Sequence, residues 1–488
     1  MKKKNHCELC RLISPALLLT IFFLNIQCHG THGPEINVYS SSQDGDRLTH
    51  KENLHFIPDK QSSIPVIVVD DKIHLQVIDG FGASFNEAGM IALNALDPDA
   101  QDSVFKMLFD PSSGAGYTLM KSPIAACDFA SAGPWYSYND TPGDTLMEHF
   151  TVERDLGPNG LITFIKKAHK YGHFEIESPM DFAPDWMYYG MQKKKDKNIK
   201  PEYYNALAEY YLKYLQAYTT KGVTINNLVL FNESVCDTCP DHGYSSVTYK
   251  EMRDIIKDFL MPRLKANRLS TKIILGETCF RYSGLELFPV VLDDPETKMY
   301  ISKLAVHGYD WDKFSSLTKL HEHYPDLPIW MTEICYVKLP VYEFSDGEFW
   351  GNMIMNDMKN WVSGWVYWNM ILDQEGGPWL TSPEHGDPDN NHQHPVVIIN
   401  RKTKEVTYTG LYYYLAHFSR FVKPGAFRIN CTGGASQLNF AGFQNTDGNI
   451  ILNIINNGEE KDCRISWRDE MAIQKLKAHS ITTFRWHG

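Results

Sequence analysis

The feature of this sequence that most constrains its fold is a series of eight short apolar runs, separated by stretches long enough for helices. In chain order they read VIDGFGASF, YTLMKSPI, HFEIESP, LVLFNE, KIILGE, KLAVHGY, PIWMTE and GWVYWN. One intervening stretch, residues 203–222, has the composition of a helix that a glycine ends. Strands that alternate with helices form a parallel sheet, and eight such units close into a barrel. The sequence therefore predicts a (β/α)8 TIM barrel.

The regions on either side of these runs have a different pattern. After about residue 425 the sequence contains short β-type runs, such as NIILNIINN, that Gly and Asn turns separate. The segment 34–76 contains IPVIVVDD and is also strand-like. We therefore expect a barrel over residues 77–425 and an accessory β-sandwich domain formed from both termini, by residues 34–76 and 426–488.

The first 28 residues have the features of an export signal. Lys2, Lys3 and Lys4 precede an apolar run, residues 15–26, that is too short to span a bilayer comfortably. Cys28 follows directly, which leaves open either plain secretion or a lipid anchor on this cysteine. We expect a secreted, periplasmic or cell-surface protein, for which a membrane surface is a partner if the anchor is present.

The net charge and the cysteines limit which classes of ligand we expect the protein to bind. The net charge of −12 argues against a nucleic-acid partner. Cys236 and Cys239 form one CxxC with no second pair, so we expect no zinc site. Cys127, Cys279 and Cys335 lie in or beside apolar runs and are expected to be buried small side chains. The sequence predicts neither a metal nor a cofactor.

The fourth and seventh runs each end on a glutamate, Glu233 and Glu333. Catalytic groups of such barrels lie at the C-terminal ends of the strands. Strands four and seven lie across the barrel mouth, so their carboxylates can face one another over a ligand. Two carboxylates that flank a glycosidic bond can hydrolyse it, one as a protonated acid and the other as an ionised group. Asn232 is placed to hold a sugar hydroxyl near the reacting carbon.

Each of these residues also has a plainer explanation. A single glutamate after a strand is usually a loop charge or a helix N-terminal residue, and a histidine on an apolar strand is usually a core residue. The pairing of the two glutamates, and the presence of Tyr309 beside His307, favour a site. Glu277 on the fifth run is either a lining residue or a helix cap. Further polar strand ends are Asp128, Trp368 and Asn369.

These residues carry a resemblance to a known family. The motifs DGFGASFNEAG, SPIAACDF, FNES, LAVHGY, MTE and YWNMILDQEGGPW resemble glycoside hydrolase family thirty, most of all its glucosylceramidase branch, from about residue 77 to the C-terminus. The resemblance implies the barrel and sandwich already predicted, and a retaining mechanism. It implies Glu233 as the acid/base and Glu333 as the nucleophile, with Tyr309 near the nucleophile. The sugar-subsite residues that it implies are Asp128, Asn232 and Trp368.

Three positions depart from the family pattern. Lys121 stands where Arg is usual, and a lysine cannot make the same forked hydrogen bonds. Met180 replaces the Trp of a Ser-Pro-Trp motif, so a sugar-stacking aromatic is missing there unless Trp186 takes its place. Ser234 stands where Pro is common. These departures keep the glutamate pair and leave the identity of the glycone open.

The sequence is compatible with three candidate functions. The first is a secreted retaining β-glycosidase that hydrolyses β-glucosides, glucosylceramide among them. The second keeps the chemistry but acts on β-1,6-glucan or a β-xyloside. The third is a catalytically silent barrel that only binds glycans, which the intact glutamate pair disfavours. The expected partner in each is a carbohydrate or glycolipid.

Overall fold

The computed structural model describes residues 33–60, 62–130, 136–189, 198–235, 246–336, 344–378 and 392–488. The predicted signal segment, with Cys28, lies outside these ranges, and so do Cys236 and Cys239. None of the helices within the ranges is both long enough and apolar enough to span a membrane.

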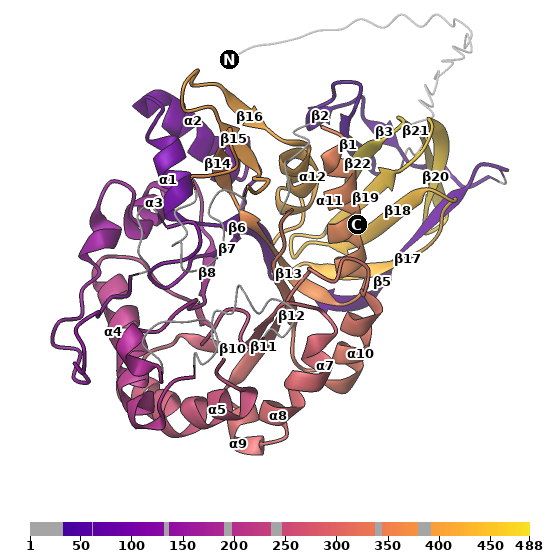
Figure 1. Ribbon diagram of the computed structural model, residues 1–488. Helices are drawn as coiled ribbons and strands as arrows, with labels where there is room; N and C mark the ends of the chain where they lie inside the picture. Colours follow the sequence, from indigo (N-terminus) through magenta and orange to yellow (C-terminus); the bar gives the residue numbers. More distant parts are fainter. Residues whose placement is uncertain are drawn as a thin grey trace, which may run out of the picture. The chain divides into compact units, whose positions relative to one another are not determined.

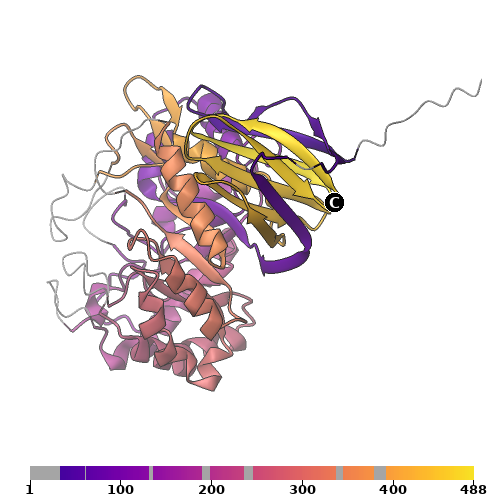
Figure 2. The ribbon, with the colours of Figure 1, turned by 90° about the vertical axis from the view of Figure 1, so that its right-hand side faces the viewer.

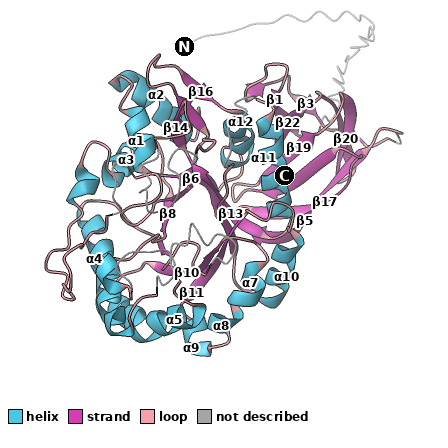
Figure 3. Cartoon of the chain, in the orientation of Figure 1, coloured by secondary structure: helices cyan, strands magenta, loops and turns pink. Residues whose placement is uncertain are grey.

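Eight parallel strands close into a barrel, as the eight apolar runs predict (Figure 3). The ring runs in chain order from β6 to β13, and the pairing of Gly364 with Gly80 joins the last strand to the first. The strands are β6 (Gly80–Ser84), β7 (Leu119–Lys121), β8 (Glu175–Ser178), β9 (Asn227–Leu228), β10 (Lys272–Thr278), β11 (Ile301–His307), β12 (Ile329–Glu333) and β13 (Val362–Asn369).

Helices surround the ring and follow its strands in sequence (Figure 1). The helix expected over residues 203–222 is α4 (Tyr204–Thr220). The others are α1 (Glu87–Leu93), α2 (Pro98–Phe109), α3 (Leu161–Ala168), α5 (Tyr249–Asp254), α6 (Met261–Ala266), α7 (Ser283–Leu287), α8 (Pro289–Leu292), α9 (Pro295–Lys298), α10 (Ser315–His323), α11 (Asp346–Lys359) and α12 (Gly410–Ser419). A π-helical segment, Ile255–Leu260, joins α5 to α6. Three short strands, β14 (Ile371–Asp373), β15 (Val397–Ile399) and β16 (Val406–Tyr408), form a separate sheet.

The interior of the barrel has an apolar layer and a polar layer. The apolar layer is a buried cluster of Leu119, Val229, Ile274, Ala305, Trp330 and Val366. Side chains of a strand alternate between its faces, so the residue two positions further along points to the same interior. Two positions beyond Leu119, Ala305 and Val366 stand Lys121, His307 and Trp368. The apolar layer therefore supports a polar layer at the C-terminal end of the barrel.

Both ends of the chain contribute to a second sheet, which confirms the predicted sandwich (Figure 2). Its strand order is β2-β1-β22-β19-β18-β17-β5-β20-β21-β4, with β3 paired to β1. The N-terminal strands are β1 (Glu35–Ser42), β2 (Thr49–His50), β3 (Leu54–His55), β4 (Ile57–Pro58) and β5 (Val66–Val77). The C-terminal strands are β17 (Phe427–Gly433), β18 (Leu438–Gln444), β19 (Asn449–Asn456), β20 (Lys461–Trp467), β21 (Glu470–Leu476) and β22 (Ser480–His487).

A buried histidine on α12 links the barrel to the sandwich. The ring nitrogens of His417 lie 2.7 Å from Thr483 Oγ1 and 2.9 Å from Ser41 Oγ, and each pair shares a hydrogen bond. Burial, helped by the charge of Arg420, lowers the pKa of His417 to about 3. The histidine is therefore neutral, and it joins β1 and β22 to the barrel by neutral hydrogen bonds.

The three cysteines that were expected to be buried are buried. Cys127 and Cys335 are free, whereas Cys279 is disulfide-bonded. Apolar neighbours indicate burial, but a bond to another cysteine leaves no trace in the local sequence.

Candidate active site

The fourth strand of the barrel is shorter than its apolar run predicts. β9 ends at Leu228, and Glu233 lies in a turn with a φ of 45°. The turn is held from two sides, because the Asn232 N–H donates to Met180 O over 2.8 Å and the Glu233 N–H donates to Glu277 O over 2.9 Å. A positive φ at a non-glycine residue costs on the order of 1–3 kcal/mol and persists where the surroundings fix it. The turn re-aims Glu233 toward the barrel mouth.

Glu233 and Glu333 meet at this mouth. Glu333 is the last residue of β12. Carboxylate oxygens of the two glutamates and a ring nitrogen of His307 all lie within 4.8 Å of one another. Glu233 is 7% exposed and Glu333 is 5% exposed. The structure thus brings together the two carboxylates that the sequence placed on opposite strands.

Donors hold both oxygens of Glu333. Tyr309 donates its hydroxyl to Oε1 over 2.8 Å, and Lys121 donates from Nζ to Oε2 over 2.8 Å. The same ammonium donates to Glu277 Oε2 over 2.5 Å. Lys121 is 1% exposed, so this position, where the family usually has Arg, supplies a buried cation to two carboxylates.

His307 connects the pair to Glu277. Its Nδ1 lies 2.7 Å from Glu233 Oε1 and 3.8 Å from Glu333 Oε1, and its Nε2 lies 3.2 Å from Glu277 Oε2. The ring is completely buried, so it reaches a ligand only through these carboxylates. The structure therefore places His307 behind the two glutamates.

The charged groups of this layer stabilise one another in their charged forms. Burial opposes the charge of His307, but the charges of Glu333 and Glu277 and the hydrogen bond to Glu233 raise its pKa to about 10. Burial likewise opposes the charge of Glu277, but Lys121 and His307 lower its pKa to about 2. Burial also disfavours charge on Lys121, yet Glu277 and Glu333 raise its pKa well above the usual value. Glu277 is thus a counter-ion shared by two buried cations.

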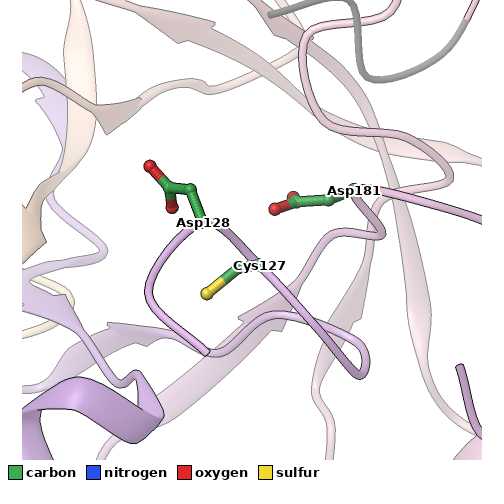
Figure 4. Close-up of side chains that lie close together, drawn as sticks. All are labelled: Cys127, Asp128 and Asp181. Carbon is green, nitrogen blue, oxygen red and sulfur yellow. The ribbon is translucent and has the colours of Figure 1, made fainter. Parts of the chain in front are cut away.

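The predicted sugar-subsite residues fall into three groups. Asn232 and Trp368 surround Lys121, whose Nζ lies 3.4 Å from Asn232 Oδ1 and 5.3 Å from the centre of the Trp368 ring. Asp128 lies beside Cys127 and Asp181 (Figure 4). Trp186 donates its indole N–H to Asn139 O and packs edge-on against Tyr203, and these contacts do not connect it to the glutamates.

Two of the three departures from the family pattern are buried and hydrogen-bonded within the protein. Met180 is fully buried and accepts a hydrogen bond at sulfur from the Tyr211 hydroxyl, 3.7 Å away. Ser234 donates its hydroxyl to Val247 O over 2.5 Å and supports the turn after Glu233.

Sequence reasoning missed two buried carboxyls on and after β8. Glu177 pairs in register with Lys121 and is completely buried, and its carboxylate oxygens have no hydrogen-bond partner within the described part of the chain. Burial and the charge of Glu277 raise its pKa well above the usual value. Asp181 follows Met180 and is 2% exposed. The available signal was the presence of acidic residues inside the run HFEIESPMD, which an apolar barrel strand would exclude.

Comparisons with known proteins agree with this geometry. Residues 78–422 match the glycosyl hydrolase family 30 TIM-barrel domain, and residues 425–484 match the glycosyl hydrolase family 30 beta sandwich domain. The chain is 25% identical over 434 residues to the lysosomal acid glucosylceramidase of Mus musculus, covering 84% of this chain and 81% of the relative. It is 27% identical over 417 residues to the endo-1,6-beta-D-glucanase of Neurospora crassa, covering 81% and 82%.

A solved structure shows the same fold. SrfJ from Salmonella typhimurium superposes with a TM-score of 0.84 at 24% identity, covering 93% of this chain and 100% of that one.

Proposed function

The chain belongs to glycosyl hydrolase family 30, and on that premise we propose that it is a retaining β-glycosidase that acts on β-glucosides, glucosylceramide-like glycolipids in particular. The observation that carries the mechanism is the approach of Glu233 and Glu333, whose oxygens lie within 4.8 Å. Retaining enzymes hold their two carboxyls about 5–5.5 Å apart, whereas inverting enzymes leave about 6.5–9.5 Å for a water. The spacing favours double displacement.

Glu333 is suited to be the nucleophile. Tyr309 and Lys121 each hold one of its oxygens, so the carboxylate is fixed in one orientation before substrate binds. Fixed orientation lowers the entropic cost of attack on the anomeric carbon. An oxygen of Glu333 bonds to that carbon while the leaving group departs, which gives a covalent glycosyl-enzyme intermediate.

Glu233 is suited to be the acid/base. His307 occupies its Oε1, so Oε2 is the oxygen that serves the leaving group. In the first step Glu233 gives its proton to the departing oxygen. In the second step it takes a proton from a water, which attacks the intermediate and releases the sugar with its β-configuration retained.

An aromatic platform beside the mouth supports an apolar aglycone. Tyr309, which contacts Glu333, lies 6.4 Å from Trp311, and Trp311 lies 5.7 Å from Tyr336 and 6.0 Å from Phe349. The last three rings are 36%, 46% and 45% exposed. Neighbouring exposed aromatic rings mark ligand or lipid contact surfaces. The platform suits the hydrocarbon part of a glycolipid.

A β-1,6-glucan is the second candidate substrate, because the Neurospora crassa relative is an endo-1,6-beta-D-glucanase and aromatic rings also stack on sugars. Rates on glucosylceramide, gentio-oligosaccharides and an aryl β-xyloside separate the candidates. Glucosylceramide should be the best substrate, and a preference for gentio-oligosaccharides would assign the glucanase activity instead. No turnover of any β-glycoside would leave a glycan-binding barrel.

We also propose that the chain is exported by its first 28 residues, either free or with a lipid on Cys28. The mass of the mature protein tests this. Loss of the signal without added mass means secretion, and a diacylglycerol mass on Cys28 means anchoring. An intact N-terminus would refute export by this segment.

The mechanism is tested by Glu233→Ala, with Glu405→Ala as a matched control at an exposed position. On an aryl β-glucoside with a good leaving group, Glu233→Ala should form the intermediate and release it slowly. Added azide should restore turnover and yield a β-glycosyl azide, because a small anion attacks without a general base. An α-azide product would show inversion. Absence of rescue would remove Glu233 from the mechanism.

A further inference from the structure

A buried carboxyl beside the active site has no role in the two-step mechanism. Asp181 lies three residues beyond the end of β8 and is 2% exposed. Its Oδ1 has no hydrogen-bond partner among the residues that the structure describes. A buried polar atom without a partner costs on the order of 1–3 kcal/mol, so its retention calls for a reason.

The carboxyl of Asp181 points toward that of Asp128, which follows the neighbouring strand β7 (Figure 4). Oxygens of both carboxyls and the Cys127 sulfur lie within 4.8 Å of one another. Asp128 is 9% exposed. The ends of two adjacent barrel strands therefore bring two acidic groups to one place at the barrel mouth.

A backbone hydrogen bond connects the strand end at Asp181 to the turn that carries Glu233. Met180 O, directly before Asp181, accepts the N–H of Asn232, directly before Glu233. Met180 Sδ accepts a hydrogen bond from the Tyr211 hydroxyl, whereas Asp181 keeps an oxygen without a partner in the described part of the chain. The backbone hydrogen bond fixes the spacing between Asp181 and the acid/base.

The carboxyls of Asp181 and Asp128 differ in the hydrogen bonds that they can make. Burial and the charge of Asp128 raise the pKa of Asp181 well above the usual value, against the opposing charge of Lys121. This shift favours the protonated form of Asp181, which can donate a hydrogen bond. The carboxyl oxygens of Asp128 can accept one. A donor beside an acceptor matches neighbouring hydroxyls of a sugar, each of which donates and accepts.

We propose that Asp181 is a specificity-determining residue that, together with Asp128, binds the neighbouring C3 and C4 hydroxyls of the glycone. This assignment rests on the proposed function. Asn232 adjoins Glu233 and serves the C2 hydroxyl near the reacting carbon, so the pair after β7 and β8 serves the opposite side of the ring. The ligand is a neutral sugar with a vicinal diol.

The test combines enzyme variants with deoxygenated substrates. The enzymes are the wild type, Asp181→Leu, whose side chain can neither donate nor accept a hydrogen bond, and the matched control Asp99→Leu at an exposed position. The substrates are an aryl β-glucoside and its 2-, 3- and 4-deoxy analogues. Asp181→Leu should lower kcat/KM about tenfold on the parent and on the 2-deoxy analogue. On the 3-deoxy or 4-deoxy analogue the loss should shrink to less than about twofold, because the partner hydroxyl is absent.

Each alternative outcome has a distinct meaning. An equal loss on all four substrates, or no loss on any, would overturn the proposal. Failure of the wild type to hydrolyse the parent glucoside would instead refute the proposed function. If Asp181→Leu does not fold, Asp181→Glu tests the same pattern, because it keeps the carboxyl and moves it. Activity that a chelator abolishes and Zn²⁺ restores would make Cys127, Asp128 and Asp181 a cation site and overturn the proposal.

Discussion

Two histidines of this protein are equally buried, but one carries a positive charge and the other is neutral. His307 and His417 are both 0% exposed. Carboxylates around His307 raise its pKa to about 10, whereas the surroundings of His417, with two hydroxyls and a nearby Arg420, leave its pKa at about 3. Burial alone therefore does not set the charge of a side chain. The neighbours set it, and they differ between the barrel mouth and the junction with the sandwich.

The neutral hydrogen bonds around His417 and the ionic contacts of the barrel mouth also contribute to stability in different ways. Around His417 each polar group has a neutral partner, so losing one contact leaves no charge uncompensated. In the mouth, Lys121 and His307 share Glu277 and approach Glu333. Removing one member of a buried ionic set leaves its partners charged without compensation, which typically costs about 3–5 kcal/mol.

The largest effect is expected from Glu333→Gln, which removes the carboxylate that Lys121 and Tyr309 hold while nearly keeping its shape. We expect turnover to fall by at least about a thousandfold, because the covalent route disappears. A mechanism-based fluorosugar should label Glu333 in the wild type, as mass spectrometry of peptides can show. Labelling of another carboxylate would contradict the assignment.

Lys121→Met should lower the free energy of unfolding by about 3–5 kcal/mol, because Glu277 loses a buried counter-ion. Lys121→Arg keeps the charge and should recover most of that loss. Denaturant unfolding of the two variants measures the difference. Equal stability of Met and Arg variants would show that size, and not charge, matters at this position.

His307→Gln should lower kcat about 10- to 150-fold, the range expected when a hydrogen bond to a charged group is lost. His417→Gln should leave kcat of the folded enzyme within about twofold, because His417 contacts no group of the mouth. Steady-state kinetics at matched folded fractions makes the comparison. Comparable losses in both variants would mean that the junction controls the site.

Over a single pH unit, the effect of the two histidines on stability is the smallest of these. Between about pH 6.5 and 3 the unfolded chain protonates His417 and the folded chain does not, so stability falls toward acid by up to about 1.4 kcal/mol per pH unit. The contribution of His307 is complete below pH 6.5 and is lost as pH rises through about 10. His417→Gln should flatten the acid limb of unfolding free energy against pH, and His307→Gln the alkaline limb. Unchanged limbs would contradict these charge states.

The sequence predicted what depends on local pattern. Alternating runs indicated the barrel, and their last residues placed Glu233 and Glu333 at its mouth. The role of Glu277 stayed undecided, because its partner Lys121 lies 156 residues away in the chain. Asp181 was overlooked for a similar reason, since the sequence does not show that it faces Asp128. Charge is visible in a sequence, but the group that compensates it is set by packing.

The early end of β9 is also set by packing that the local sequence does not show. Val229, Leu230 and Phe231 are buried and apolar, as a strand predicts. Hydrogen bonds from the following turn to the chain at Met180 and Glu277 override that local preference. The prediction was correct for burial and wrong for the backbone, because tertiary contacts decide the conformation next to Glu233.

The pairing of β1 with β22 sets an order of events during synthesis. Ser40 and Thr482 are opposite each other in this pair although 442 residues separate them. At roughly 5–20 residues per second, a ribosome needs about 20–90 s to make the intervening chain. The whole barrel sequence is therefore synthesised before β22, the strand that pairs with β1, is available. A message truncated before the last strand would yield a chain whose β1 edge stays open to other molecules. The eight residues of β22, Ser480–His487, therefore cover the β1 edge only at a late stage of synthesis.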